Sequence, residues 1–310
     1  MKTEELRLLV QICKLYYFEN LSQKEIADKL YISRPQVSKL LTRAKEQNII
    51  SININDPFAE EFQLAGQLKK RYHLKEVLVA DTRDVSKANA LKVLAKSMSV
   101  LFTSFLANGN KVGISAGFTV AACARYMNIY NCRNLQFIPL LAGLSFEGEY
   151  WYANSNCQRL AERFGSKYMV LNAPLVVRNS DLRGELEDNE LIAPVVSTYD
   201  KLDAILLGIG QTTIDSTLGK CPVSKEEITW PHEHGAKAIV GASFIDAGGN
   251  EFLQEQSDLF LGIKLPQIKK CKSVVAVAIG EEKAEAIKAA LKGGYITAFC
   301  TDLATAKLLI

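Results

Sequence analysis

Residues 21–41 have the sequence LSQKEIADKLYISRPQVSKLL, in which two helix starts are separated by a short turn. Ser22 is a natural N-cap, and Glu25 stands three residues later as its capping-box partner. Ser33 is a second N-cap residue, and Pro35 follows in the first helical turn, where a missing amide hydrogen does no harm. The segment therefore predicts two helices, the second of them over residues 34–47.

The sequence on either side of this segment extends the motif. Residues 3–18 carry apolar side chains at a helical period, and residues 49–55 alternate between apolar and polar like a strand. The order helix, helix, tight turn, helix, strand is that of a winged helix-turn-helix. We therefore predict a winged helix-turn-helix domain over residues 1–55.

The helix after the turn of such a motif lies in the major groove of DNA. Arginine and glutamine side chains can pair with base edges, while lysine, serine and threonine can hold phosphates. The expected partner is double-stranded operator DNA, and the alternative is a helical hairpin with a solvated basic face. The candidate DNA-binding residues are Ser22, Gln23, Ser33, Arg34, Gln36, Ser38, Lys39, Thr42 and Arg43.

The distribution of charge supports an anionic partner for this segment. The 310 residues contain 37 Lys and Arg against 34 Asp and Glu, a net charge of +3. Residues 1–55 contain nine basic and six acidic side chains, so the remaining 28 of each kind cancel. The whole excess lies in the first sixth of the chain, which indicates a small basic module on a neutral body.

Composition narrows the class of protein further. A chain that is 48% hydrophobic and 23% charged is typical of a globular protein, and no long uncharged apolar window predicts a membrane span. The charged N-terminus lacks the apolar core of a signal peptide, so we expect a cytoplasmic protein with reduced cysteines. Seven widely spaced cysteines and three histidines offer no metal-site spacing, and we expect neither a metal nor a cofactor.

Asp56 and Pro57 mark a domain boundary, because proline interrupts the preceding strand pattern. Residues 58–72 then have the period of an amphipathic helix, within a connector assigned to residues 56–74. Such a helix could dimerise or could pack against the core of the next domain.

Residues 75–310 alternate short apolar runs with helical stretches, which predicts a doubly wound, mainly parallel α/β domain. The expected strands are 77–80, 111–115, 135–141, 167–171, 204–209, 238–240, 273–278 and 296–300. The expected helices are 86–108, 119–128, 155–164, 190–199, 282–292 and 303–309.

Several of these strands end in glycine-containing turns, at residues 113–119, 141–145, 208–211 and 280–283. Glycine lets backbone amides approach a ligand, and a helix N-terminus attracts anions. Ligands of such sheets bind at the carboxyl ends of the strands. Because the chain has no P-loop and no GxGxxG, the turns favour a small anionic ligand rather than a nucleotide.

The whole chain resembles the SorC/DeoR-type sugar-binding transcriptional regulators. The most specific stretch is GEEKAEAIKAALKGGYI at residues 280–296, followed by TDLATA at 301–306. The turns at 113–119, 172–174 and 208–210 are also similar to those of the family. The resemblance implies a second domain with the fold of sugar-phosphate isomerases and deaminases, which binds a sugar, often phosphorylated, and changes the affinity for DNA. It also implies assembly into dimers or tetramers.

The chain departs from the family pattern in the turn after the second strand, which keeps Gly117 and Thr119 but lacks the usual basic residue. We expect the anionic group of the effector to meet the amides of residues 115–119 or the turn before Lys283, which matches a ligand-contacting lysine of the family. Sugar hydroxyls and an apolar sugar face would meet polar and aromatic side chains. The candidate effector-binding residues are Ser115, Gly117, Phe118, Thr119, Leu141, Gly143, Gln211, Asp246 and Lys283.

The rival class is an enzyme, a sugar-phosphate isomerase or deaminase with an appended DNA-binding domain. Such an enzyme needs a base for proton abstraction. Glu147, Glu149 and Asp215 are the acids near the glycine turns that could serve, and each could equally be a solvated loop residue. We expect a regulator with no catalytic residue.

Overall fold

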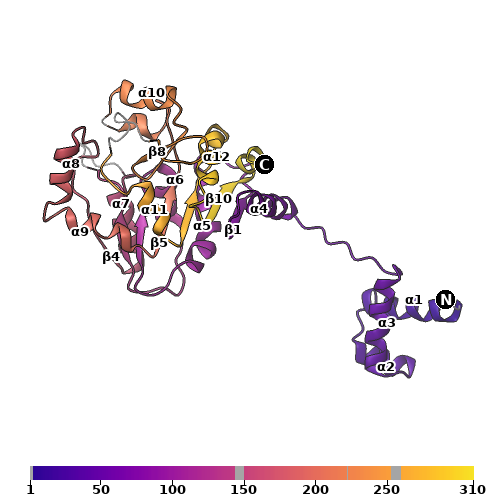
Figure 1. The fold of residues 1–310 in the computed structure, drawn as a ribbon. Helices are drawn as coiled ribbons and strands as arrows, with labels where there is room; N and C mark the ends of the chain where they lie inside the picture. Colours follow the sequence, from indigo (N-terminus) through magenta and orange to yellow (C-terminus); the bar gives the residue numbers. More distant parts are fainter. Residues whose placement is uncertain (1–2, 144–149, 222, 253–259) are drawn as a thin grey trace. The chain divides into compact units, whose positions relative to one another are not determined.

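The computed structural model describes residues 3–143, 150–221, 223–252 and 260–310. The chain divides into two compact units, residues 1–57 and 58–310, each with its own core (Figure 1).

The first unit is a helix-turn-helix made of α1 (Thr3–Tyr17), α2 (Gln23–Leu30) and α3 (Arg34–Glu46). Both predicted caps form. The Ser22 hydroxyl accepts from the amide of Glu25, whose carboxylate accepts from the amide of Ser22 at 2.8 Å. Apolar side chains from all three helices, among them Leu9, Ile26 and Val37, form the core. The predicted helix-turn-helix is therefore confirmed.

The predicted strand over residues 49–55 is wrong. Among the described residues 3–57 no strand forms, and residues 51–56 have no regular secondary structure. The amides of Ile49 and Ile50 bond to the carbonyl of Ala44 and so follow the end of α3. Ile52 and Ile54 are 56% and 80% exposed. Alternation can mark a strand only where a second strand supplies hydrogen bonds, and here no such neighbour is present in the described part of the unit.

The second unit is built on a seven-stranded parallel sheet. Its order is β1-β10-β9-β5-β2-β3-β4, and each pair of neighbours is parallel. The strands are β1 (Glu76–Ala80), β2 (Lys111–Ile114), β3 (Gln136–Pro139), β4 (Lys167–Tyr168), β5 (Ala204–Gly208), β9 (Val274–Val277) and β10 (Ala298–Asp302). The chain runs outward from β2 through β3 to β4 on one side and from β5 through β9 to β10 on the other. The order therefore reverses between β2 and β5, and the predicted doubly wound fold is confirmed.

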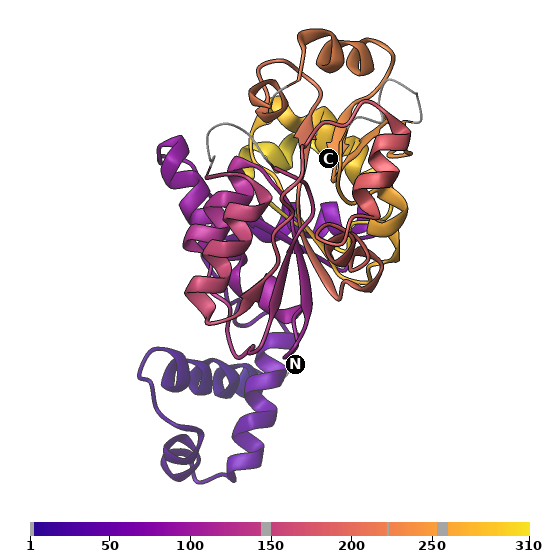
Figure 2. The same cartoon turned by 90° about the vertical axis from the view of Figure 1, so that its left-hand side faces the viewer.

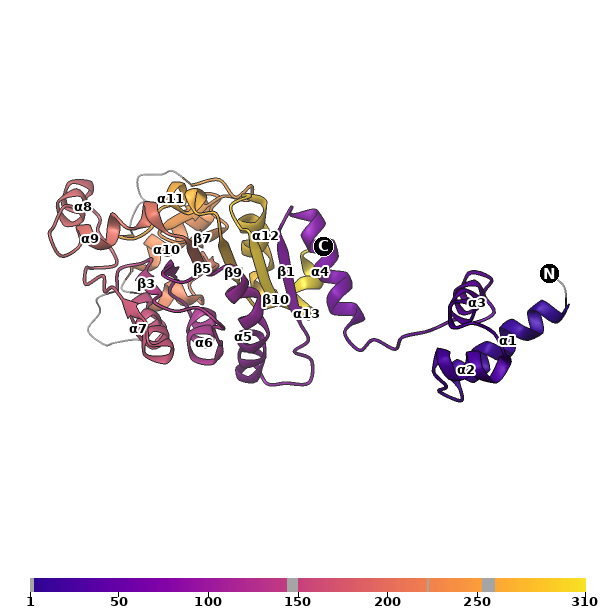
Figure 3. The ribbon, with the colours of Figure 1, turned by 90° about the horizontal axis from the view of Figure 1, so that it is seen from below.

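Two helical layers cover the sheet, as Figures 2 and 3 show. On one face lie α5 (Lys87–Ser104), α6 (Phe118–Tyr126) and α7 (Ala153–Phe164), with a core that includes Met98, Val120 and Leu160. On the other face lie α4 (Ala59–Arg71), α11 (Leu265–Lys270), α12 (Ala284–Lys292) and α13 (Leu303–Leu308). The helices α8 (Ser180–Glu187), α9 (Ala193–Val196) and α10 (Lys225–Glu233) lie in the longer connections.

A small antiparallel sheet adjoins the main one. It has the order β6-β7-β8, with β6 (Gly210–Gln211), β7 (Ala238–Val240) and β8 (Ser243–Ile245). The expected strand at 238–240 is therefore present, but it belongs to this second sheet. Since β6 follows β5 after a single residue, the small sheet stands beside the carboxyl end of β5.

The helix α4, expected as a connector, packs into the core of the second unit. Leu64 and Leu68 are buried against β1 and α13, and the Tyr72 hydroxyl donates to the carbonyl of Leu309 at 2.8 Å. Phe58 and Phe62 remain 54% and 69% exposed. One side of α4 therefore packs against the core, which is one of the two roles expected from the sequence. The other side is exposed to solvent.

Candidate functional site

The exposed side of α3 carries most of the predicted DNA-binding side chains. Arg34 stands at the first position of the helix, and Lys39 follows within the second turn. Gln36, Ser38 and Thr42 are exposed as well. The structure thus brings five of the predicted residues onto the open side of one helix.

Other predicted residues also hold the local backbone. Ser22 and Ser33 cap α2 and α3 through their hydroxyl oxygens. Gln36 uses its amide oxygen to accept from the backbone and hydroxyl of Ser33, at 3.1 and 3.2 Å, so its amide nitrogen is the group left for a base edge. The Thr42 hydroxyl donates to a backbone carbonyl one turn earlier, and Gln23 is half-buried at the start of α2.

Arg43 differs from the other basic residues of this helix. It is half-buried, and its guanidinium forms an ion pair with Glu5 of α1. A phosphate contact by Arg43 would therefore compete with this internal pair, whereas Arg34 and Lys39 have no ion-pair partner in the described part of the chain.

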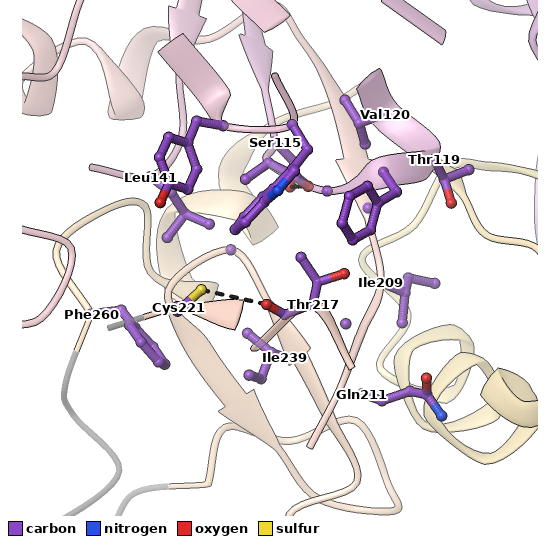
Figure 4. Close-up of a pocket in the computed structure, with 18 of the residues that line it drawn as sticks. Ser115, Thr119, Val120, Leu141, Ile209, Gln211, Thr217, Cys221, Ile239 and Phe260 are labelled. Atoms are coloured by element: carbon purple, nitrogen blue, oxygen red, sulfur yellow. Dashed lines mark hydrogen bonds between the residues drawn. The ribbon is translucent and has the colours of Figure 1, made fainter. Parts of the chain in front are cut away.

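A pocket in the second unit lies over the carboxyl ends of the central strands (Figure 4). Its walls include residues 115–120 after β2, residues 208–211 at the end of β5, and Leu141 and Ala142 after β3. The pocket encloses about 830 Å³ of space when the solvent at its open mouth is included. The pocket stands where the strand order reverses, which is where this topology places a ligand.

The turn between β2 and α6 forms one wall. Gly117 caps α6 with φ of +123°, a conformation that L side chains rarely adopt, and its amide donates to the carbonyl of Trp151 at 2.9 Å. The next three amides, of Phe118, Thr119 and Val120, have no acceptor within the described residues. Because these residues line the pocket, the positive end of α6 is available to an anion.

Buried polar contacts hold this turn in place. The side-chain amide of Asn156 donates to the carbonyls of Ser115 and Trp151, at 3.1 and 3.3 Å. Asn156 is fully buried on α7, so its position is set by the core. Gly208 allows the end of β5 to approach, since a Cβ atom there would lie 3.2 Å from the carbonyl oxygen of Ala116. The pocket wall is therefore rigidly tied to the sheet.

One lysine lines the pocket, and a second lies beside a ring of its wall. Lys283 lines it from the start of α12, as expected. The Lys220 ammonium lies 4.6 Å from the centre of the Phe118 ring, at the first turn of α6. Lys220 was missed from the sequence, because nothing in its local pattern indicates that its loop returns to the β2–α6 turn.

The turn before Lys283 is less suited to an anion than the β2–α6 turn. The amide of Gly280 already donates to the Thr305 hydroxyl at 2.9 Å. Glu281 and Glu282 add two carboxylates at the same place. The Gln211 side chain lines the pocket and donates to the carbonyl of Glu282 at 2.7 Å, which leaves its amide oxygen for a ligand.

Two predicted effector residues lie outside the pocket lining. Asp246 accepts hydrogen bonds from the amides of Gly248 and Asn250, at 2.8 and 2.9 Å, and closes its own turn. Partial burial acts to raise the pKa of Asp246, but the hydrogen bonds from Asn250 and Gly248 outweigh it and hold the pKa below its ordinary value. Gly143 packs beside the ring of Tyr152 instead of lining the pocket.

The remaining lining is mostly apolar, and its residues come from strands and loops that are far apart in the sequence. Trp151 lies 5.5 Å from Phe118 between ring centres. The Cys221 thiol donates weakly to the Thr217 carbonyl at 3.6 Å, and burial raises its pKa to about 12, so it stays protonated near neutral pH. The other apolar residues of the wall are Tyr152, Leu175, Ile209, Ile239, Phe260 and Val277.

The acids considered for catalysis do not form a base in the described pocket. Asp215 is exposed and lies outside the lining, while Glu147 and Glu149 fall outside the described residues. Among the described residues, no three His, Cys, Asp or Glu side chains are grouped as metal ligands, and no helix has the length and apolarity to cross a membrane. All seven cysteines are free thiols, five of them buried.

Comparison with known families assigns both units. A family described as "Putative sugar-binding domain" matches residues 56–310, and Sigma-70 region 4, a helix-turn-helix region, matches residues 10–47. The sorbitol operon regulator of Klebsiella pneumoniae is 28% identical over 99% of both chains, and the deoxyribonucleoside regulator of Bacillus subtilis is 27% identical over 100% of this chain and 99% of its own.

Solved structures of sugar-operon and DeoR family regulators are similar to this chain as well. The full-length sorbitol operon regulator superposes with a TM-score of 0.76 over 99% of each chain, at 28% identity. A DeoR family transcriptional regulator from Listeria monocytogenes superposes with a TM-score of 0.72 over 81% of this chain and 99% of its own, at 26% identity. These similarities confirm the resemblance, the fold class and the interpretation as a DNA-binding regulator with a sugar-binding domain.

Proposed function

Since this chain belongs to the family that carries the sugar-binding domain, we propose that it regulates a carbohydrate-utilisation operon and that a phosphorylated sugar, bound in the pocket over β2 and β5, alters its affinity for operator DNA. The observation that carries the proposal is the first turn of α6. There, three backbone amides without an acceptor in the described chain line the pocket, beside the Lys220 ammonium.

The chemistry of the pocket supports a phosphate more than a neutral sugar. A helix N-terminus and a lysine both stabilise a dianion, and a lysine is a point charge suited to phosphate. Lys283 offers a second ammonium from α12. The amide oxygen of Gln211 and the hydroxyl of Thr217 supply polar contacts for sugar hydroxyls, while Phe118 supplies an apolar surface.

DNA binding in this proposal belongs to α3 with its flanking caps. One recognition helix contacts few base pairs, so a regulator of this type is expected to bind its site as a dimer or tetramer. The unpacked side of α4, with Phe58 and Phe62, is a candidate contribution to that assembly. A cytoplasmic location follows from access to DNA and stays a prediction.

The test compares phosphorylated and unphosphorylated ligands on the full chain. We would measure thermal unfolding with hexose, hexitol and pentose phosphates, with the corresponding free sugars, and with inorganic phosphate. A shift with one or more sugar phosphates, and little with the free sugar, is the expected result. A shift with free sugars alone would remove the phosphate from the proposal, and turnover of any sugar phosphate would favour the isomerase or deaminase alternative.

A further inference from the structure

The turn between α2 and α3 contains a backbone conformation that its residue does not favour. Tyr31 is the C-cap of α2, with φ of 55° and ψ of 39°, in the left-handed region. This region is open to glycine and is tolerated by asparagine, aspartate and histidine, whereas a bulky side chain there is an outlier. The other non-glycine residues of positive φ in the described chain follow this rule, being Asn20, Asn48, His73, Asp84, Asn131 and Asn134.

The described structure shows no side-chain interaction of Tyr31 that would offset the cost of this backbone conformation. Its side chain is 96% exposed, and within the described chain it forms no hydrogen bond and no ring interaction. The cap itself is made by the backbone, because the Tyr31 amide donates to the carbonyl of Ala27. A glycine would make the same cap with less strain, so folding alone does not explain a tyrosine at this position.

The position of Tyr31 suggests what its side chain contacts. It precedes Ser33, the N-cap of α3, by two residues, and Arg34 and Gln36 follow on the exposed side of the helix. When the N-terminal residues of a recognition helix meet base edges, the turn before them lies beside a sugar-phosphate strand. Tyrosine hydroxyls are among the groups that donate to phosphate oxygens at such interfaces.

We propose that Tyr31 contacts the DNA backbone, with its hydroxyl donating to a phosphate oxygen and its ring resting against the adjacent deoxyribose. The contact fixes the register of α3 in the groove and carries no sequence information itself. Backbone strain that persists without a structural benefit is characteristic of functional positions. Tyr31 is therefore assigned a positioning role in DNA binding that is separate from base recognition by the α3 side chains.

The proposal predicts that replacing Tyr31 with glycine has opposite effects on the stability of the fold and on the affinity for DNA. Tyr31→Gly relieves the strained conformation, so the variant should unfold at the same temperature as the natural chain or higher. Its affinity for DNA should fall about tenfold, as expected for loss of a hydrogen bond to a charged group together with ring contacts. Tyr31→Phe keeps the ring and loses the hydroxyl. Its affinity for DNA should therefore lie between that of the natural chain and that of Tyr31→Gly.

The experiment uses the full chain and a duplex that the natural protein selects from a random-sequence pool, with fluorescence anisotropy over a range of salt. A neutral hydroxyl releases no counterion, so Tyr31→Gly should leave the slope of log affinity against log salt unchanged. Lys39→Ala, in contrast, should reduce that slope by about one. Phe18→Ala is the matched control, because Phe18 is another exposed aromatic residue of the same unit, 81% exposed.

Two results would overturn the proposal. One is an unchanged affinity in Tyr31→Gly with a native unfolding temperature. The other is unchanged affinity combined with lost regulation in a purified transcription reaction, which would assign the ring to a protein partner. Since glycine suits the backbone at this position, failure of the variant to fold would also contradict the strain on which the argument rests.

Discussion

At the level of single residues, Lys220 and Lys283 make the phosphate proposal testable. Replacing either with glutamine removes one ammonium, from beside Phe118 or from the pocket lining respectively, and we expect the affinity for a phosphorylated effector to fall about tenfold. DNA binding without effector should not change. Isothermal calorimetry measures the first quantity and anisotropy the second. Lys288→Gln is the matched control, since Lys288 pairs with Glu285 and does not line the pocket.

The role of Arg43 in DNA binding can be tested by replacing Arg43 and its ion-pair partner Glu5 separately. If Arg43 also holds a DNA phosphate, Arg43→Ala weakens binding to all sequences, whereas Glu5→Ala does not, because it leaves the guanidinium in place. We expect this pattern. Equal and small losses of stability in both variants, at unchanged DNA affinity measured by anisotropy, would make the pair purely structural. A half-buried pair that water still reaches, as this one does, contributes about 0–1 kcal/mol.

Asp246 should affect stability and not the effector. Its carboxylate accepts two backbone amides within its own turn, so Asp246→Asn should lower the free energy of unfolding by about 1 kcal/mol. Its pKa is below the ordinary value, so the stabilisation is present above about pH 4 and is lost as the pH falls through the folded-state pKa. Denaturant melts at pH 7 and pH 3 should show the difference between the two proteins shrinking. Altered effector affinity at pH 7 would return Asp246 to the site.

These residues show what a sequence can indicate about a pocket. Gly117, Phe118 and Thr119 were found because a strand followed by a glycine and a helix makes a local pattern. Lys220 and Trp151 were missed because their approach to Phe118 depends on how distant loops close over the sheet. Asp246 lies outside the pocket lining, which a family-like motif does not indicate, because the turn that its carboxylate closes depends on the fold around it.

At the level of helices and strands, substitutions on the two sides of α4 should have different effects, one on the stability of the fold and the other on assembly. Leu68→Ala leaves a cavity in the core and should lower the free energy of unfolding by about 2–5 kcal/mol without changing the assembly. Phe62→Glu alters an exposed side and should cost little stability, but it should shift the sedimentation coefficient towards the monomer. An unchanged coefficient in Phe62→Glu would exclude this side of α4 from the interface.

Short sequence motifs predicted helix starts well, because a capping box depends only on residues that are neighbours in the sequence. The capping boxes at Ser22 and Ser33 begin helices, and an equivalent box of Ser224 with Glu227 begins α10, which the periodicity did not indicate. The strand over residues 49–55 failed because pairing needs a partner from elsewhere in the chain. The strand at 238–240 was found, but its sheet was not, since strand order is a property of the whole domain.

At the level of the whole molecule, the effector should stabilise one unit and not the other. The pocket lies within residues 58–310, so a ligand at one hundred times its dissociation constant should stabilise that unit by about 2.7 kcal/mol. Hydrogen exchange on the full chain separates the units by peptide. We expect slower exchange around β2, β5 and α6, and no change in the core of α1–α3 in the absence of DNA. Equal protection of both units would mean that the effector also acts on the helix-turn-helix directly.

The aromatic wall of the pocket has an optical consequence. The chain contains two tryptophans, and one of them, Trp151, stands in the wall, while Trp230 stacks on His234 in α10 with 4.2 Å between ring centres. A sugar phosphate absorbs no near-ultraviolet light, yet its arrival places polar and charged groups near the Trp151 indole, which is otherwise buried in the wall. The emission of that single side chain therefore makes the protein its own label-free sensor of pocket occupancy, with Trp230 as an internal reference.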